Sequence, residues 1–173
     1  GIMLNYLADH EISFIKTTPS LFYLLLNCGK FEEIGPKLKL RLLLLGGEKI
    51  KVDDVRRFIS LHPETQIVNH YGPTETTIGT VAHNILNDEF EAYAQNPVIG
   101  NGIFNAQTLV LDDQNNLLPN WVYGELCIAG AGLARGYLNH PELTVERFCN
   151  HPLEDGQLIY KTGDITYVTN GKL

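Results

Sequence analysis

One stretch of the chain collects residues that could bind a phosphate and a metal ion. The run Thr74-Glu75-Thr76-Thr77 follows the pair Gly72-Pro73. Glycine accepts backbone angles that other residues avoid, and proline fixes its own φ and has no N–H, so this pair predicts a turn. Hydroxyl and carboxylate oxygens beyond the turn suit a nucleotide phosphate and its magnesium ion. A polar turn that only caps the next element is the alternative interpretation.

Three further blocks surround this loop in a recognisable order. They are Gly46-Gly47-Glu48, the long run Gly124–Gly130 continued by Gly132–Tyr137 and Pro141–Phe148, and Tyr160-Lys161-Thr162-Gly163-Asp164. With Asn69-His70-Tyr71-Gly72-Pro73-Thr74-Glu75 they resemble the signature motifs of the adenylate-forming enzymes, most closely the amino-acid-activating adenylation domains of nonribosomal peptide synthetases. The resemblance extends over essentially the whole chain.

The resemblance implies a nucleotide site with divided roles. Thr74 would contact the phosphate, Glu75 would hold magnesium, and Tyr71 would stack on adenine, whose amino edge Asn69 would read. The Asp164 carboxylate would accept hydrogen bonds from both ribose hydroxyls. The full implied set is Gly46, Gly47, Glu48, Asn69, Tyr71, Gly72, Thr74 and Asp164, with Thr74 and Glu75 as the catalytic pair.

Each of these residues also has a purely structural interpretation. Thr74 could cap a helix, Glu75 could be a surface carboxylate, and the glycines could serve an ordinary strand-to-helix turn. Asp164 could be a turn residue after glycine. Arg135 and Lys161 lie inside matching motifs, where salt bridges fit them as well as ligand contacts do.

The family reaction implied by the resemblance joins a carboxylate to the α-phosphate of ATP and releases pyrophosphate. The acyl group then passes to the phosphopantetheine thiol of a carrier-protein domain, which works beside condensation domains. The implied cofactors are therefore ATP or AMP, magnesium and carrier-bound phosphopantetheine. The family's glycine- and threonine-rich phosphate loop and its C-terminal lysine are not among the 173 residues. We therefore expect an internal fragment that does not catalyse alone.

Alignment with the family also implies which residues line the amino-acid pocket. A lysine and a histidine among them, with no acid, would be costly to bury unless the ligand supplied the negative charge. Aspartate is therefore the favoured substrate and asparagine the next. Lys16 could instead end its strand at the surface, and His70 could be an ordinary hydrogen-bonded residue. The implied pocket is Lys16, Leu44, Gly46, His70, Ile78 and Gly79.

Two rival functions remain beside the amino-acid-activating one. An acyl- or aryl-CoA ligase of the same superfamily would share the nucleotide motifs, although the run Leu133–Tyr137 favours the peptide-synthetase branch. The second rival function is that of a non-catalytic nucleotide-binding or docking module. A pure scaffold has no use for Glu75 and Asp164, which argues against that module.

The elements around the first motifs alternate between strands and helices. Residues 12–16, 40–45 and 66–68 read as strands, and the run 40–45 as one that is buried on both faces. Helices are expected at the N-terminus, over 19–27 and over 52–61, where Asp53-Asp54 suits the first turn. This order predicts a parallel, flavodoxin-like α/β layer with ligands at the carboxyl ends of its strands.

The second half of the chain has a different sequence pattern. Residues 87–96 read as a polar loop, after which short strands near 107–111 and 125–129 flank a turn at 112–116, and one short helix is expected over 141–148. This pattern predicts a small distorted β-barrel subdomain. We therefore expect an α/β subdomain over residues 1–96 and a β-barrel-like subdomain over 97–173.

Composition excludes other classes of function. The net charge is −7 and no basic stripe is present, which disfavours nucleic acid as a partner. Cys28, Cys127 and Cys149 have no metal-ligand spacing and fit buried or indifferent thiols in a reducing cytoplasm. Apolar runs such as Leu42–Leu45 are too short to span a membrane, and we expect no membrane partner.

Overall fold

A computed structural model describes residues 1–173, which divide into two compact units. Unit 1 comprises residues 1–70 and 83–97, and unit 2 comprises residues 71–82 and 98–173. The chain therefore passes between the units three times, once within strand β3 (Gln66–Tyr71) and once within β4 (Val81–Ile85). The predicted subdomain boundary between residues 96 and 97 stays a prediction, and the two units are described separately below.

Unit 1 is built on three parallel strands. Strand β1 (Phe14–Thr17) pairs with β2 (Leu42–Gly46), and β2 pairs with β3. The first sheet has the strand order β1-β2-β3-β4-β5, and β5 is Asn101–Gly102. The helices of unit 1 are α1 (Ile2–Asp9), α2 (Pro19–Leu26), α3 (Phe31–Ile34), α4 (Val52–Leu61) and α5 (Phe90–Gln95), with a 3₁₀ turn η1 at Gly35–Lys37.

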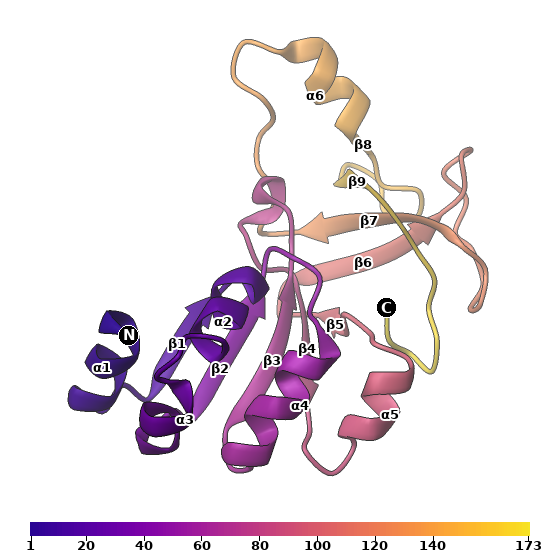
Figure 1. The fold of residues 1–173 in the computed structure, drawn as a ribbon. Coiled ribbons are helices and arrows are strands. Elements are labelled where there is room, and N and C mark those ends of the chain that lie inside the picture. The colour runs from indigo at the N-terminus through magenta and orange to yellow at the C-terminus, as the bar shows by residue number, and fades with distance from the viewer. The chain divides into compact units, whose positions relative to one another are not determined.

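The core of unit 1 lies on one face of these strands. Figure 1 shows α2 and α4 in front of the sheet, and Phe22 of α2 packs edge-on against Phe58 of α4 at 5.4 Å between ring centroids. Alternation along β2 buries Leu43 and Leu45 and leaves Leu42 and Leu44 only partly buried. The expectation that this strand is buried on both faces was wrong, because its helices cover one face.

Two short helices of unit 1 were missed in the sequence. The predicted loop at 87–96 contains α5, whose Phe90 and Tyr93 are three residues apart and both buried. The polar connection before residue 40 contains α3, which buries Phe31 and Ile34 at the same spacing. Two apolar residues are too few to give a visible helical period, although they are enough to fix a helix of one or two turns.

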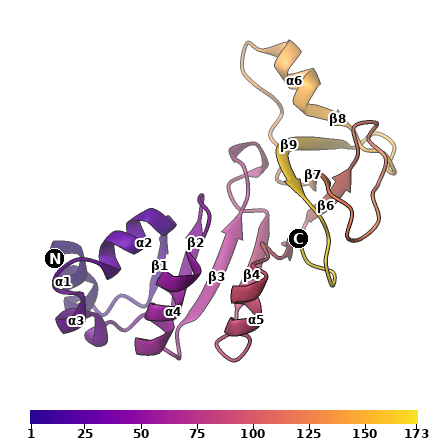
Figure 2. The same cartoon turned by 45° about the vertical axis from the view of Figure 1, so that its right-hand side comes forward.

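Unit 2 contains a second, antiparallel sheet. Its strands are β6 (Ala106–Leu111), β7 (Gly124–Gly130), β9 (Leu158–Thr166) and β8 (Phe148–Asn150), in that spatial order. The helix α6 (Pro141–Arg147) precedes β8, as Figure 2 shows. The predicted α/β class is confirmed, with a parallel layer followed by a β-rich part. The second sheet is open, since β6 and β8 form its edges, and no closed barrel is present.

No helix of the structure combines the length and the apolar character that crossing a membrane requires.

Candidate functional site

Strand β3 carries three of the motif residues instead of a loop. The sequence placed the end of this strand at Val68, but pairing with β2 continues through Leu45 with Asn69 and Gly46 with His70. Backbone pairing with a buried neighbour therefore outweighs the polarity of these side chains. Asn69, His70 and Tyr71 consequently have fixed backbone positions rather than loop positions.

In unit 2, Tyr71 and Asp164 come together across 93 positions of the chain. The Tyr71 hydroxyl donates a hydrogen bond of 2.5 Å to Asp164 Oδ2, and the Tyr71 ring packs on the core cluster that includes Val81 and Leu126. Burial, and then the hydrogen bond and charge of Asp164, raise the pKa of Tyr71 above its ordinary value. The expected adenine platform and ribose ligand are thus direct neighbours.

The hydroxyl row after Pro73 begins with a 3₁₀ turn, η2 (Thr74–Thr76), and ends at Thr77. Two residues of the row have structural roles. The Thr76 hydroxyl is buried, where it donates to the Pro73 carbonyl at 3.1 Å and lies 2.6 Å from the Thr80 hydroxyl. Thr77 adopts the left-handed conformation and donates to the Gly132 carbonyl. Thr74 and Glu75 are left as the members of the row available to a ligand.

Two tyrosines support the Glu75 side chain. The Tyr137 hydroxyl donates to Glu75 Oε1 at 2.5 Å and lies 3.4 Å from the Tyr160 hydroxyl. The backbone is held as well, because the Ala134 N–H donates to the Glu75 carbonyl at 2.7 Å. The hydrogen bond from Tyr137 is the main reason why the pKa of Glu75 lies below its ordinary value. Glu75 is therefore an ionised carboxylate in a fixed orientation.

These oxygen donors fit a magnesium ion. Magnesium in nucleotide sites usually takes one or two carboxylates and completes its shell with phosphate oxygens and water. Glu75 would be the protein carboxylate, with the exposed Thr74 beside it. No group of three or more His, Cys, Asp or Glu side chains is arranged so that it could hold a metal ion by itself.

The remaining residues of this turn have unusual backbones. Ile78 follows Thr77 in the left-handed region, with φ of 69°, and its side chain is 62% exposed. For a β-branched residue this conformation costs about 1–3 kcal/mol. A Cβ on Gly72 would lie 2.6 Å from the Ile78 carbonyl oxygen, so the fold of the turn requires glycine there. Gly79 separates Ile78 from the buried Thr80.

In unit 1, the strand register brings four predicted pocket residues to one face of the sheet. Lys16 pairs with Leu44, and Gly46, two residues further along β2, pairs with His70. Paired residues of parallel strands, and residues two apart, share a face. Lys16, Leu44, Gly46 and His70 therefore lie on the face that β2 turns away from its buried Leu43 and Leu45.

One of the two basic residues on this face affects the other. Burial, and then the positive charge of Lys16, hold the pKa of His70 below its ordinary value. No Asp or Glu side chain contributes to this change in the pKa of His70. The environment of this sheet face thus disfavours the protonated form of His70.

The glycine loop after β2 consists of residues whose structural roles can be seen. A Cβ on Gly46 would lie 2.4 Å from the His70 carbonyl oxygen, and Gly47 has φ of 85°. Glu48 accepts hydrogen bonds from the Ser20 N–H at 2.9 Å and the Ser20 hydroxyl at 2.8 Å. A carboxylate at a helix N-terminus stabilises that helix, so Glu48 binds α2 in this structure. Its assignment to a nucleotide stays a prediction.

Asn69 lies on the opposite face from His70. Its side chain is buried and Nδ2 donates to the Tyr93 hydroxyl at 3.4 Å, while the Tyr93 ring stacks on His83. Its predicted contact with adenine stays a prediction.

Three side chains that touch the predicted site were missed. Tyr137 contacts Glu75, Tyr160 contacts Tyr137, and Glu125 contacts the backbone of Gly163 next to Asp164. All three lie inside the motif blocks that carry the family resemblance, so the signal was present. The sequence did not show the contacts that form on folding. The pairing of β7 with β9 makes residues 30 to 42 positions apart neighbours, and Tyr137 meets Glu75 across 62 positions.

Comparison with known proteins identifies the family. The model for the AMP-binding enzyme family matches residues 1–138. Surfactin synthase subunit 2 of Bacillus subtilis (strain 168) is 47% identical over 161 residues, which make up 93% of this chain and 4% of that protein. Holo-PA1221, an NRPS protein containing adenylation and PCP domains, aligns with a TM-score of 0.87 and 31% identity. That alignment covers 99% of this chain and 29% of the other.

A second solved structure agrees. Holo-AB3403, a four domain nonribosomal peptide synthetase bound to AMP and glycine, has a TM-score of 0.82 and 31% identity over 98% of this chain and 12% of its own. The chain therefore spans only a small part of each protein that it matches. The family model nevertheless covers most of the 173 residues, including the central motif. The chain belongs to the AMP-binding enzyme family and, within it, to the adenylation domains of nonribosomal peptide synthetases.

Proposed function

We propose that this chain is part of an ATP-dependent domain that activates aspartate as aspartyl-AMP and passes it to a carrier-protein phosphopantetheine thiol. In that reaction an oxygen of the amino acid's α-carboxylate attacks the α-phosphorus of ATP, and pyrophosphate leaves. The parent enzyme would then transfer the aspartyl group to the thiol and release AMP. The binding of AMP and glycine by AB3403 supports an amino acid and an adenylate as ligands of this domain type.

The nucleotide part of the proposal rests on the neighbours Tyr71 and Asp164 and on the supported carboxylate of Glu75. Asp164 would accept from the ribose hydroxyls, and Tyr71 would keep that carboxylate oriented. Glu75 would bind magnesium, which neutralises phosphate charge when bound. Tyr137 keeps Glu75 ionised, and thus able to bind a cation.

The choice of aspartate as substrate rests on the sheet face that Lys16 and His70 share. The charge of Lys16 there helps to lower the pKa of His70. Two basic groups without an acid favour an anionic ligand, since a carboxylate would stabilise both. Asparagine, with a neutral side chain of the same shape, is the closest competitor. The carrier and condensation domains are partners that we propose from the family.

The test is amino-acid-dependent exchange of pyrophosphate into ATP by the intact adenylation domain that contains this chain. We expect aspartate to give the strongest exchange, and Lys16→Ala and His70→Ala each to lower kcat/KM for aspartate by about tenfold or more, the loss of one charge-assisted contact. Lys49→Ala, at an exposed lysine after the glycine loop, is the matched control.

Other outcomes of the exchange assay discriminate between the alternatives. Preference for asparagine or another uncharged amino acid would keep the enzyme and overturn the charge argument. Exchange supported by fatty or aryl acids alone would favour a CoA ligase. No exchange with any acid would leave a nucleotide-binding module. We further propose that the 173 residues alone are inactive, as two groups that the family uses lie outside them.

A further inference from the structure

The Asp164 carboxylate stands on a bulge in strand β9. Cys127 of β7 pairs with Lys161, and Glu125 pairs with Ile165. Between these pairs β9 has Thr162, Gly163 and Asp164, whereas β7 has only Leu126. The extra residues lose their ladder partners, so their N–H groups need other acceptors. The bulge also requires Gly163 to adopt φ of 81°.

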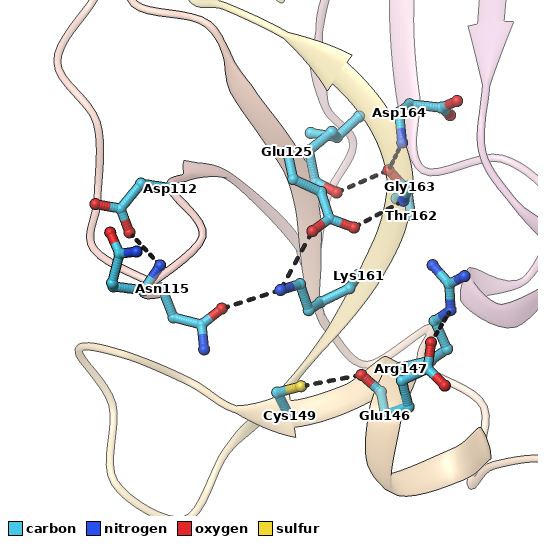
Figure 3. Close-up of polar contacts among 12 residues, drawn as sticks. Asp112, Asn115, Glu125, Glu146, Arg147, Cys149, Lys161, Thr162, Gly163 and Asp164 are labelled. Atoms are coloured by element: carbon cyan, nitrogen blue, oxygen red, sulfur yellow. Dashed lines mark hydrogen bonds and ion pairs between the residues drawn. The ribbon is translucent and has the colours of Figure 1, made fainter. Parts of the chain in front are cut away.

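Two side chains supply those acceptors. The Gly163 N–H donates to Glu125 Oε1 at 2.9 Å, and the Asp164 N–H donates to the Thr162 hydroxyl at 3.0 Å. The Thr162 hydroxyl in turn donates to the Leu126 carbonyl at 2.7 Å. Figure 3 shows the Glu125 carboxylate beside the Gly163 amide, with Asp164 next along β9.

The second oxygen of Glu125 is held by a cation. Lys161 Nζ lies 3.3 Å from Glu125 Oε2 and donates to Asn115 Oδ1 at 3.3 Å, as Figure 3 shows. The Glu125 and Lys161 side chains are only 20% and 21% exposed, so this pair is less screened than a surface pair. The pair fixes the direction from which Glu125 reaches Gly163.

We infer that Glu125 is a positioning residue for nucleotide binding, because it holds the bulge that orients the Asp164 carboxylate toward the ribose hydroxyls. The inference rests on the proposed role of Asp164. Glu125 does not touch the nucleotide itself. Loss of its acceptor oxygen frees the Gly163 amide, and the aspartate one residue later loses its fixed direction.

The test compares the affinities of the intact adenylation domain for AMP and for 2′,3′-dideoxy-AMP by calorimetry. Their ratio measures the ribose contacts and is independent of the folded fraction, since both nucleotides titrate the same protein. In the unsubstituted domain we expect a ratio of about 100, from two charge-assisted hydrogen bonds of at least roughly 1.4 kcal/mol each. Asp164→Ala should reduce it to about 1–3.

Glu125→Met keeps the stem of the side chain and removes the acceptor, and we expect the ratio to fall at least about fivefold. Glu125→Gln keeps one oxygen that can accept from the Gly163 N–H but places an amide NH2 where an oxygen faces Lys161, so its ratio should fall less than that of Glu125→Met. Glu142→Met, at an exposed glutamate of α6, should leave the ratio unchanged. Thr162→Val removes the other side-chain acceptor of the bulge and should lower the affinity ratio as Glu125→Met does.

The outcomes separate this inference from the proposed function. A full ratio in Asp164→Ala would overturn the ribose role of Asp164 itself. A ratio that collapses in Asp164→Ala and is retained in Glu125→Met would leave that role intact and overturn the inference. If Glu125→Met does not fold, a full ratio in Thr162→Val would overturn the inference that the bulge's side-chain acceptors orient Asp164.

Discussion

Glu75 shows how one hydroxyl can orient a carboxylate and favour its ionised form. Tyr137 donates to Oε1 and holds the pKa of Glu75 below its ordinary value. An ionised, oriented carboxylate can bind a metal without first losing a proton or changing rotamer. Tyr137 therefore supports Glu75, although its place in a motif block does not show that the two residues are in contact.

Replacement of the Tyr137 hydroxyl should change how the free energy of unfolding depends on pH in the acid range. Because the folded pKa of Glu75 is lower than the unfolded one, the stabilisation is complete above the unfolded pKa and is lost as pH falls through the folded pKa. We expect Tyr137→Phe to lower the free energy of unfolding at neutral pH by about 1 kcal/mol. Urea unfolding at neutral pH and at about pH 3 checks this, since the difference should shrink at the lower pH.

Tyr123→Phe is the control for that experiment, because Tyr123 is an exposed tyrosine of unit 2 whose ring contacts Tyr167. Equal losses for Tyr137→Phe at both pH values would mean that the hydroxyl contributes through packing and not through the charge of Glu75.

His70 gives a second pH signature at the residue scale. Its folded pKa is lowered by burial and by Lys16, so the free protein loses stability as pH falls through that pKa. A bound aspartate carboxylate would raise the pKa again and couple binding to proton uptake. We expect aspartate affinity to improve about threefold to tenfold between about pH 8 and about pH 6.

Calorimetry with aspartate and asparagine measures this dependence. Asparagine should show little change over the same range, and His70→Gln should flatten the response to aspartate. A response to aspartate that persists unchanged in His70→Gln would assign the titrating group elsewhere.

At the scale of elements, the pairing of strands explains what the sequence could and could not predict. The parallel strands, α4 and the glycine turns were predictable, because apolar period and turn residues are local signals. The extension of β3 through Asn69–Tyr71 was not, since it depends on pairing with β2. The bulge under Asp164 depends likewise on the register between β7 and β9.

The close approach of β2 and β3 makes Gly46 a test of this pairing. A Cβ there would lie 2.4 Å from the His70 carbonyl oxygen, which cannot move without disturbing the β3 ladder. We expect Gly46→Ala to destabilise the chain by about 1–3 kcal/mol, the usual cost of overpacking. Gly29→Ala is the matched control, as a Cβ there meets nothing within 4 Å. Equal unfolding midpoints for the two variants would contradict the close approach.

At the scale of the whole molecule, the sequence named candidate ligand-binding residues but not the residues that support them. The motifs named Tyr71 and Asp164 from positions far apart, and unit 2 brings them into contact. Their supports, Tyr137 and Glu125, act through geometry that exists only after folding. Family resemblance thus predicts the groups that would touch a ligand, and the structure adds the residues that hold those groups in place.

A last prediction concerns the catalytic groups that the family resemblance implies. Charge that develops on the phosphate needs fixed cations and dipoles, and removal of one such donor typically costs about 10²–10³ in rate. The resemblance assigns two of them, the glycine- and threonine-rich loop and a lysine, to residues outside these 173. We therefore expect the chain alone to catalyse aspartate-dependent pyrophosphate exchange at least about 10⁴-fold more slowly than the intact domain. Circular dichroism must first show that the chain is folded. Exchange by the chain alone at a rate near that of the intact domain, and lost in Glu75→Gln, would mean that these 173 residues already hold the catalytic groups.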